Sequence, residues 1–161
     1  MATTAIYAGS FDPITRGHED LIRRSCEFVD HLVVAVAINS SKKALFSTEE
    51  RVQLIRAATA DNKRVEVTQF EGLLVDFAQK IGAKFNIRGL RAVSDFEYEF
   101  QMALMNRHMS ETFETVFMVP SVETTYISSS VVREVAQHHG SLKGLVHPTV
   151  AKALANKFRS K

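Results

Sequence analysis

The chain has 161 residues, and 20 lysines and arginines against 18 aspartates and glutamates give it a formal net charge of only +2. Hydrophobic residues make up 45% and charged residues 24%, which excludes a disordered chain and is typical of a globular domain. So small a basic excess argues against nucleic-acid binding, and no apolar run is long enough to predict a membrane span. Cys26 is the single cysteine, which excludes an internal disulfide and fits a reducing compartment. We therefore expect one cytoplasmic domain over residues 1–161, without nucleic-acid or membrane partners.

Short β-type runs alternate with helical patterns along the whole chain. The predicted strands cover residues 5–8, 32–38, 65–68, 85–88 and 116–119. The predicted helices cover residues 17–29, 47–60, 73–81, 94–109, 128–138 and 148–158. Such alternation favours right-handed crossovers, so we expect an α/β fold with a doubly wound, five-stranded parallel sheet. Ligands of such sheets bind beyond the carboxyl ends of the strands, so functional residues should follow the strands.

The first of these segments, Gly9 to His18, leaves the first strand and enters the first helix. His18 falls on the helix stripe that also carries Leu21, Ile22, Ser25, Phe28 and Val29, so its ring should point inward over the sheet end. The free N–H groups of a helix start favour an anion there. The alternative is a capped turn with a half-buried structural histidine. Neither G-x-x-x-x-G-K-S/T nor G-x-G-x-x-G is present, which excludes a P-loop and a dinucleotide fingerprint.

Basic residues follow the second and fourth strands, at the edge where a parallel sheet binds ligands. Lys42 and Lys43 come after the second strand, and Arg88-Gly89-Leu90-Arg91 closes the fourth. Arginine offers a planar fork to phosphate oxygens, and a glycine between two arginines predicts a tight turn that aims both at one site. For the two lysines, a solvated surface pair is the open alternative.

The predicted helix over 94–109 has three distinct faces. Phe96, Phe100, Ala103 and Arg107 share one side, whereas Tyr98, Met102, Met105 and Met109 share the opposite side. Asp95, Glu99 and Asn106 lie between them. A helix that is apolar on two opposed faces needs two coverings. We expect the sheet to cover one face, and either another subunit or the C-terminal helices to cover the methionine-rich face.

The run Thr124-Thr125-Tyr126-Ile127-Ser128-Ser129-Ser130 follows the fifth strand and opens the next helix. Three serines at a helix start offer hydroxyl groups and free backbone N–H groups together, which suits a phosphate. Ordinary N-capping is the alternative, and it needs only one of the three.

Two of these segments resemble signatures of the nucleotidyltransferase superfamily. Gly9 to His18 is similar to G-x-F-D-P-x-T/H-x-G-H, and Ile127 to Ser130 with Arg133 is similar to I-S-S-S/T-x-x-R/K. Further matches over nearly the whole chain narrow the resemblance to the phosphopantetheine adenylyltransferases. This implies a Rossmann-like nucleotidyltransferase fold and transfer of the adenylyl group of ATP to 4′-phosphopantetheine, giving dephospho-coenzyme A and pyrophosphate.

The resemblance also implies roles for individual residues. The implied catalytic residues are His18, Lys42 and Arg91. The implied ATP-binding residues are Ser10, Phe11, His18, Gly89, Leu90, Arg91, Glu99, Thr124, Thr125, Tyr126, Ile127, Ser128, Ser129 and Ser130. The implied acceptor-binding residues are Ser10, Lys42, Leu74, Arg88 and Asn106. No protein-held metal is implied; Mg²⁺ would arrive with ATP, and the assembly would be a homohexamer.

Three residues depart from the family pattern, and two other functions are alternatives to the implied one. Ala8 replaces the usual proline, Arg16 a common asparagine and Thr124 a frequent tryptophan. A sister enzyme acting on nicotinate mononucleotide or glycerol 3-phosphate is one alternative, although Arg88, Asn106 and the Lys42 loop favour pantetheine. A non-catalytic nucleotide sensor is another, which the presence of His18 beside the serine run disfavours.

Overall fold

The computed structural model describes residues 2–38, 43–91 and 93–159, which build a parallel sheet with helices on both faces. The strands are β1 (Thr4–Gly9), β2 (His31–Ala37), β3 (Val65–Phe70), β4 (Phe85–Gly89) and β5 (Glu114–Met118). Their order in the sheet is β3-β2-β1-β4-β5. Because β1 pairs with β2 on one side and with β4 on the other, the direction of winding reverses between β1 and β4.

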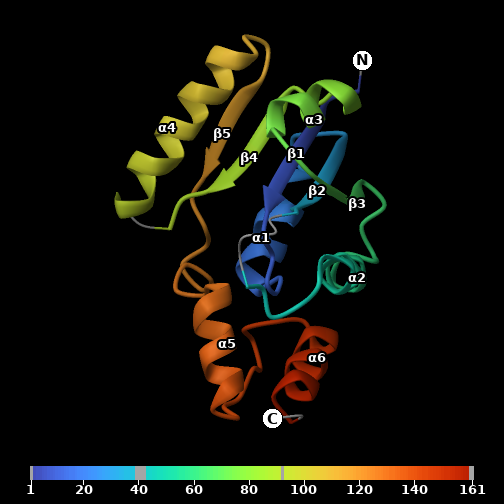
Figure 1. Ribbon diagram of the computed structural model, residues 1–161, viewed down its shortest axis with the longest axis vertical. Coiled ribbons are helices and arrows are strands. Elements are labelled where there is room, and N and C mark those ends of the chain that lie inside the picture. Colours follow the sequence, from blue (N-terminus) through green and yellow to red (C-terminus); the bar gives the residue numbers. More distant parts are fainter. Residues whose placement is uncertain (1, 39–42, 92, 160–161) are drawn as a thin grey trace.

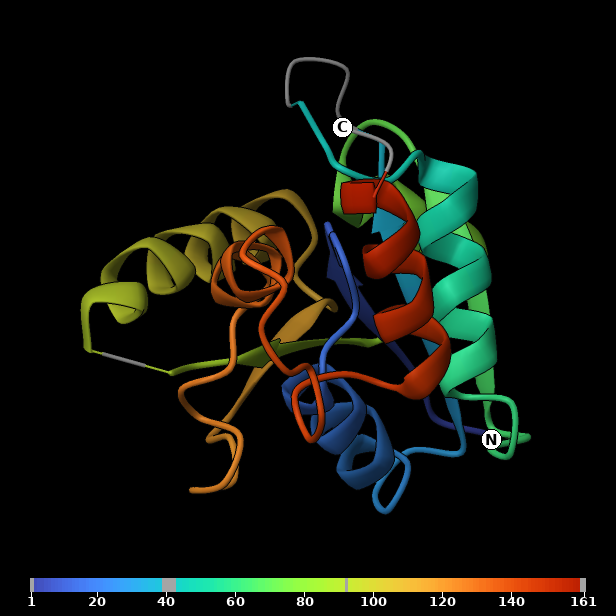
Figure 2. The ribbon, with the colours of Figure 1, turned by 90° about the horizontal axis from the view of Figure 1, so that it is seen from below.

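Every predicted strand and helix is present, which confirms the doubly wound α/β fold. The helices are α1 (Arg16–Ser25), α2 (Thr48–Ala58), α3 (Leu74–Ile81), α4 (Val93–Met109), α5 (Ser129–Gln137) and α6 (Pro148–Arg159). In Figure 1, α4 runs beside β5, and the strands point toward the end of the molecule that holds α5 and α6. Figure 2 shows α6 lying along α2, against which it packs.

Two hydrophobic clusters, one on each face of the sheet, hold these layers together. The side chains of Ala5 and Tyr7 enter the larger cluster, which also contains residues of α1, α2, α5 and α6. Their neighbours Ile6 and Ala8 enter the smaller cluster beneath α3. Successive side chains of a strand point to opposite faces, so one strand serves both clusters. This explains why β2 is an almost unbroken buried run of valine, alanine and leucine.

The helix boundaries follow local signals, with one exception. Ser47 and Glu50 form the reciprocal capping box at the start of α2, and Pro148 opens α6, as the sequence predicts. However, α1 ends at Ser25, four residues before its predicted end at 29. Tight bonds from Glu27 N–H to the Arg24 carbonyl and from Phe28 N–H to the Ser25 carbonyl wind the chain out of the helix. The expectation that Phe28 extends the apolar stripe is therefore wrong, and this side chain is exposed.

Helix α4 keeps much of its apolar surface exposed. The exposed large side chains are Phe96, Tyr98, Phe100, Met102, Leu104, Met105 and Met109. Phe96 contacts Phe117 of β5 edge to face, yet Phe96 and Phe100 are both exposed, so the expectation that the sheet covers the phenylalanine side is wrong. Asn106, on the face between the two apolar sides, is buried instead. The C-terminal helices instead pack on α2 and on each other, and the alternative in which they cover the methionine-rich face is wrong. No helix in the described part of the chain is long and apolar enough to cross a membrane.

Candidate active site

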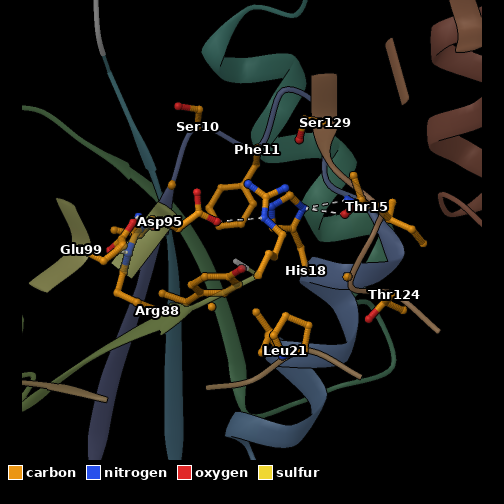
Figure 3. Close-up of a pocket in the computed structure, with 18 of the residues that line it drawn as sticks. Ser10, Phe11, Thr15, His18, Leu21, Arg88, Asp95, Glu99, Thr124 and Ser129 are labelled. Carbon is orange, nitrogen blue, oxygen red and sulfur yellow. Dashed lines mark hydrogen bonds and ion pairs between the residues drawn. The ribbon is translucent and has the colours of Figure 1, made fainter. Parts of the chain in front are cut away.

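A cavity of about 460 Å³ opens at the carboxyl ends of β1 and β4, where the direction of winding reverses. Figure 3 shows its walls, which come from β1, α1, β4, α4 and the segment before α5. The lining residues include Tyr7, Ser10, Phe11, Thr15, His18, Leu21, Arg88, Gly89, Arg91, Asp95, Tyr98, Glu99, Thr124, Ile127 and Ser129. Parallel sheets bind ligands at this kind of reversal, so the cavity is the candidate active site.

His18 is the third residue of α1, after the N-cap Thr15, and its ring faces the cavity (Figure 3). The backbone N–H of Thr15 donates to Nδ1 of His18 at 3.0 Å, and the Thr15 hydroxyl lies 3.0 Å from the same nitrogen. Because a backbone N–H can only donate, Nδ1 must be unprotonated and the ring proton must sit on Nε2. The imidazole is thereby set as a neutral donor that can meet a ligand through Nε2.

The electrostatics of the cavity agree with a neutral His18. Burial, together with the positive charges of Arg91 and Arg88, lowers the pKa of His18 to about 4. The ring also packs against Phe11, whose ring centroid is 5.1 Å away, and Phe11 in turn meets Tyr7 edge to face. This aromatic packing fixes the orientation of the imidazole from the side opposite Thr15.

Arg88 reaches into the cavity from β4 and is held there by two partners. Its Nε donates to Glu99 Oε2 at 2.7 Å, Nη2 pairs with Glu99 Oε1, and Nη1 donates to the Ala8 carbonyl at 2.7 Å. Burial by itself would lower the pKa of Arg88, but the bonds and charge of Glu99 outweigh it and raise that pKa. The guanidinium is therefore a permanent positive charge in fixed orientation at the sheet end.

Gly89 and Arg91 follow Arg88 along the same wall of the cavity. Gly89 does not form the tight turn that the sequence predicts. A Cβ at Gly89 would lie 2.5 Å from Leu21 Cδ1, so any larger residue would have to displace the Leu21 side chain where β4 approaches α1. Gly89 belongs to a strand and has no positive φ, which corrects the expectation of a tight turn. Arg91 is half-exposed at the cavity mouth, where its Nε lies 3.9 Å from Asp95 Oδ2.

The three serines at the start of α5 make three different bonds. Ser128 is the N-cap, and its Oγ accepts from the Val131 N–H at 3.2 Å. The Ser129 hydroxyl donates to the Pro13 carbonyl at 2.8 Å, and the Ser130 hydroxyl accepts from Arg133 at 3.4 Å. One serine thus caps the helix, as the alternative requires, while the hydroxyl of Ser129 lies at the cavity wall.

A smaller hollow of about 310 Å³ adjoins the cavity and shares Ser10 and Ser129 with it. Lys43, Arg51 and Arg133 line this hollow, and Asp12 is its acidic residue. The Asp12 carboxylate already accepts the N–H groups of Leu45 and Phe46 at 2.8 and 3.0 Å. The hollow is therefore positively charged, as a site for phosphate oxygens would be.

Most of the sequence-predicted site residues meet at these two hollows, and some do not. Those lining the cavity are Ser10, Phe11, His18, Arg88, Gly89, Arg91, Glu99, Thr124, Ile127 and Ser129, and Ser130 lines the smaller hollow. Outside both lie Leu74, Leu90, Asn106, Thr125, Tyr126 and Ser128. Leu74 packs beside the smaller core cluster and Asn106 is buried on α4. Lys42 lies outside the described residues.

Sequence reasoning missed three residues that shape the site. Thr15 sets the tautomer of His18, and its capping position three residues before the histidine could have revealed it. Asp12 and Arg51 fix the first loop through contacts with residues 34 and 41 positions away. No local pattern marks such long-range partners.

The described residues offer no protein-built metal cage. No three histidine, cysteine, aspartate or glutamate side chains among them gather closely enough to hold an ion. Glu99 is bound by Arg88, and Asp12 is occupied by backbone N–H groups.

The sequence profile of the cytidylyltransferase-like family matches residues 6–135. A phosphopantetheine adenylyltransferase from Geotalea daltonii is 54% identical over 154 residues, which is 96% of this chain and 96% of that protein. The chain belongs to the phosphopantetheine adenylyltransferase family. This confirms the resemblance drawn from the two signatures, and the chain is accordingly a nucleotidyltransferase.

Two solved structures share the fold of this family member. The "Putative Nicotinate-nucleotide Adenylyltransferase" from Vibrio parahaemolyticus superposes with a TM-score of 0.77 at 20% identity, covering 100% of this chain and 98% of its own. A lipopolysaccharide core biosynthesis protein from Thermoplasma volcanium has a TM-score of 0.58 at 20% identity, over 75% of this chain and 99% of its own. At such low identity the likeness concerns the fold alone.

Proposed function

We propose that this adenylyltransferase joins ATP and 4′-phosphopantetheine to give dephospho-coenzyme A and pyrophosphate. The observation that carries the proposal is the neutral His18, fixed with its Nε2–H toward a cavity that also holds Arg88 and Arg91. His18 and Arg91 can donate hydrogen bonds to phosphate oxygens there, and Arg88, whose nitrogens are bound by Glu99 and the Ala8 carbonyl, contributes a fixed positive charge. The near relative from Geotalea daltonii bears the corresponding name.

The reaction needs a site that brings two anions together. A phosphate oxygen of the acceptor forms a bond to the α-phosphorus of ATP, while the bond from that phosphorus to the bridging oxygen breaks and pyrophosphate leaves. The acceptor is already anionic, so no base has to remove a proton from it. Catalysis then rests on positioning and on donors that meet the charge developing on the transferred phosphoryl group. Neutral His18 suits this role because its Nε2–H can donate a hydrogen bond, whereas a neutral imidazole is too weak an acid to release that proton.

Each predicted site residue receives a role in this proposal. His18, Lys42 and Arg91 stabilise the transition state, and Ser10 lies at the junction of the two substrates. The triphosphate extends from the cavity toward Ser129 and Ser130, where the start of α5 and Arg133 favour negative charge. Other residues assigned to ATP are Phe11, Gly89, Leu90, Glu99, Thr124, Thr125, Tyr126, Ile127 and Ser128. Arg88, Leu74 and Asn106 are assigned to the acceptor.

Magnesium enters as part of the Mg²⁺–ATP substrate rather than as a resident ion. The carboxylates of Asp12 and Glu99, occupied by protein donors, support this view. We further propose a cytoplasmic protein that folds as one domain and assembles as a homohexamer. The apolar surface of α4, with Tyr98, Met102 and Met105 exposed, supports an assembly built through this helix.

Comparing the turnover of three acceptors tests this proposal. Pyrophosphate release is measured with ATP and each of 4′-phosphopantetheine and nicotinate mononucleotide, and with CTP and glycerol 3-phosphate. Turnover with 4′-phosphopantetheine is expected to exceed turnover with the other two acceptors. Preference for another acceptor would assign a sister activity, and binding of ATP without turnover on any acceptor would identify a nucleotide sensor.

A further inference from the structure

The loop from Ser10 to Pro13 has a backbone conformation that it does not hold by itself. Phe11 has a φ of +46°, a region that residues other than glycine seldom occupy without support from their surroundings. Side chains from other elements supply that support. The Ser10 carbonyl accepts from Arg51 at 2.7 Å, the Asp12 carbonyl accepts from Arg133, and the Pro13 carbonyl accepts from Ser129 at 2.8 Å. The loop is thus fixed from α2 and α5.

Arg51 on α2 is the most deeply buried of these tethers, with only 6% of its surface exposed. Besides the Ser10 carbonyl, its guanidinium donates to Thr48 Oγ1 at 3.0 Å and to the Ser47 carbonyl at 3.3 Å. Within the described residues it forms no ion pair with a carboxylate. A buried charge of this kind is costly unless hydrogen bonds compensate it. All three of its nitrogens are engaged by protein oxygens, so the guanidinium fixes structure rather than offering a free fork to a ligand.

The bond from Arg51 to the Ser10 carbonyl also sets the direction of the Phe11 N–H. The Ser10–Phe11 peptide is trans, so its C=O and N–H point in opposite directions. Arg51 lines the smaller hollow and not the cavity, which places it on the far side of the loop. Fixing the carbonyl toward Arg51 therefore turns the Phe11 N–H toward the cavity side. This N–H donates to no other group in the described part of the chain.

We propose that Arg51 is a positioning residue for nucleotidyl transfer. Its nitrogens are bonded to protein oxygens, and it orients the Ser10–Phe11 peptide so that the Phe11 N–H can donate to a phosphate oxygen in the transition state. The inference rests on the proposed function, because it assumes that a phosphoryl group reacts in this cavity. Loss of the Arg51 guanidinium should therefore slow the chemical step more than it weakens substrate binding.

The test compares two arginines of the same helix that each donate to a backbone carbonyl. Arg56 donates to the Val67 carbonyl at 3.0 Å and lines neither hollow, so Arg56→Met is the matched control for Arg51→Met. Steady-state kinetics by pyrophosphate release and thermal unfolding are measured for both. Arg51→Met is expected to lower kcat by about tenfold or more, as for loss of one transition-state donor, with both KM values within about threefold of wild type. Arg56→Met is expected to retain the wild-type kcat.

Two results would overturn the positioning role: an unchanged kcat in Arg51→Met, with or without a raised KM for ATP, or an equal loss of kcat in Arg56→Met. If Arg51→Met does not fold, Arg51→Lys and Arg56→Lys repeat the comparison, because lysine keeps the charge but loses the planar fork. An inactive wild-type protein would instead refute the proposed function. With an active wild type, the same variants test Arg51 alone.

Discussion

At the scale of single residues, His18 is made useful by its neighbour Thr15. The N–H of Thr15 occupies Nδ1, and this leaves Nε2–H as the group that faces the cavity. A cationic imidazole would place two donors against each other at Nδ1, so the same contact disfavours protonation. Burial and two nearby guanidinium groups act in the same direction and lower the pKa of His18 to about 4. His18 is therefore a hydrogen-bond donor across the physiological pH range.

Replacing His18 by alanine should lower kcat by about 10²-fold while the protein stays folded, because one donor to the transition state is lost. Pyrophosphate release gives the rate, and circular dichroism checks the fold. His138→Ala is the control, since His138 is exposed at the end of α5. A wild-type rate in His18→Ala would remove this residue from the catalytic assignment.

The depressed pKa of His18 also predicts how stability depends on pH. An unfolded histidine titrates near 6.5, whereas His18 in the folded, ligand-free protein titrates near 4. Between these values the unfolded state binds more protons, so the free energy of unfolding should fall as pH is lowered from about 6.5 to about 4. Urea denaturation should show a steeper fall for wild type than for His18→Ala. Equal pH dependence in the two proteins would contradict the assignment, as would NMR detection of the Nδ1–H tautomer.

At the scale of elements, the cavity depends on how closely β4 approaches α1. The lack of a side chain at Gly89 lets Leu21 pack over the strand end, and Leu21 itself forms part of the cavity wall. Arg88 precedes this contact in β4 and Arg91 follows two residues beyond it. The packing of one glycine against one leucine therefore sets where both guanidinium groups enter the site.

Gly89→Ala should destabilise the fold by about 1 to 3 kcal/mol, because the new methyl group would overlap Leu21 Cδ1. Denaturant unfolding measures the loss. Leu21→Val removes the colliding atom, so the double variant should be more stable than the sum of the two single changes predicts. Strict additivity would show that the two residues do not press on each other.

At the scale of the whole molecule, α4 has one side that lines the cavity and another that is exposed on the surface. One part of it turns Asp95 and Glu99 toward the cavity, while the methionine-rich side remains uncovered by the rest of the chain. Exposed apolar surface of this extent is typical of an interface between subunits. Because the same helix carries Glu99, which binds Arg88, assembly through α4 would also stiffen one wall of the site.

Met105→Glu should reduce the mass of the assembly, because it places a charge in the proposed interface between copies of α4. Sedimentation velocity or light scattering measures the mass. Phe28→Glu is the control, since Phe28 is an exposed apolar residue beyond the end of α1. An unchanged mass in Met105→Glu, or an equal change in both variants, would place the interface elsewhere.

The sequence by itself determined the elements and the segments that carry the chemistry. Alternating β-type and helical periodicity predicted every strand and helix, because each depends on residues within one or two turns of each other. Caps such as Ser47 and Pro148 are equally local. The loop from Gly9 to His18 and the serine run were identified in the same way.

Only the tertiary structure decided how those segments meet. The order of the strands places β4 beside β1, and only then can Arg88 donate to the Ala8 carbonyl, 80 residues earlier in the chain. The close approach of Gly89 to Leu21 arises from the same pairing, whereas the bond from Arg51 to Ser10 depends on where α2 packs. Local periodicity carries no information about which strands are neighbours, because strand order is set by packing across the whole sheet. The segments that carry the chemistry could therefore be identified from the sequence, whereas the contacts that position their side chains are set by the tertiary structure.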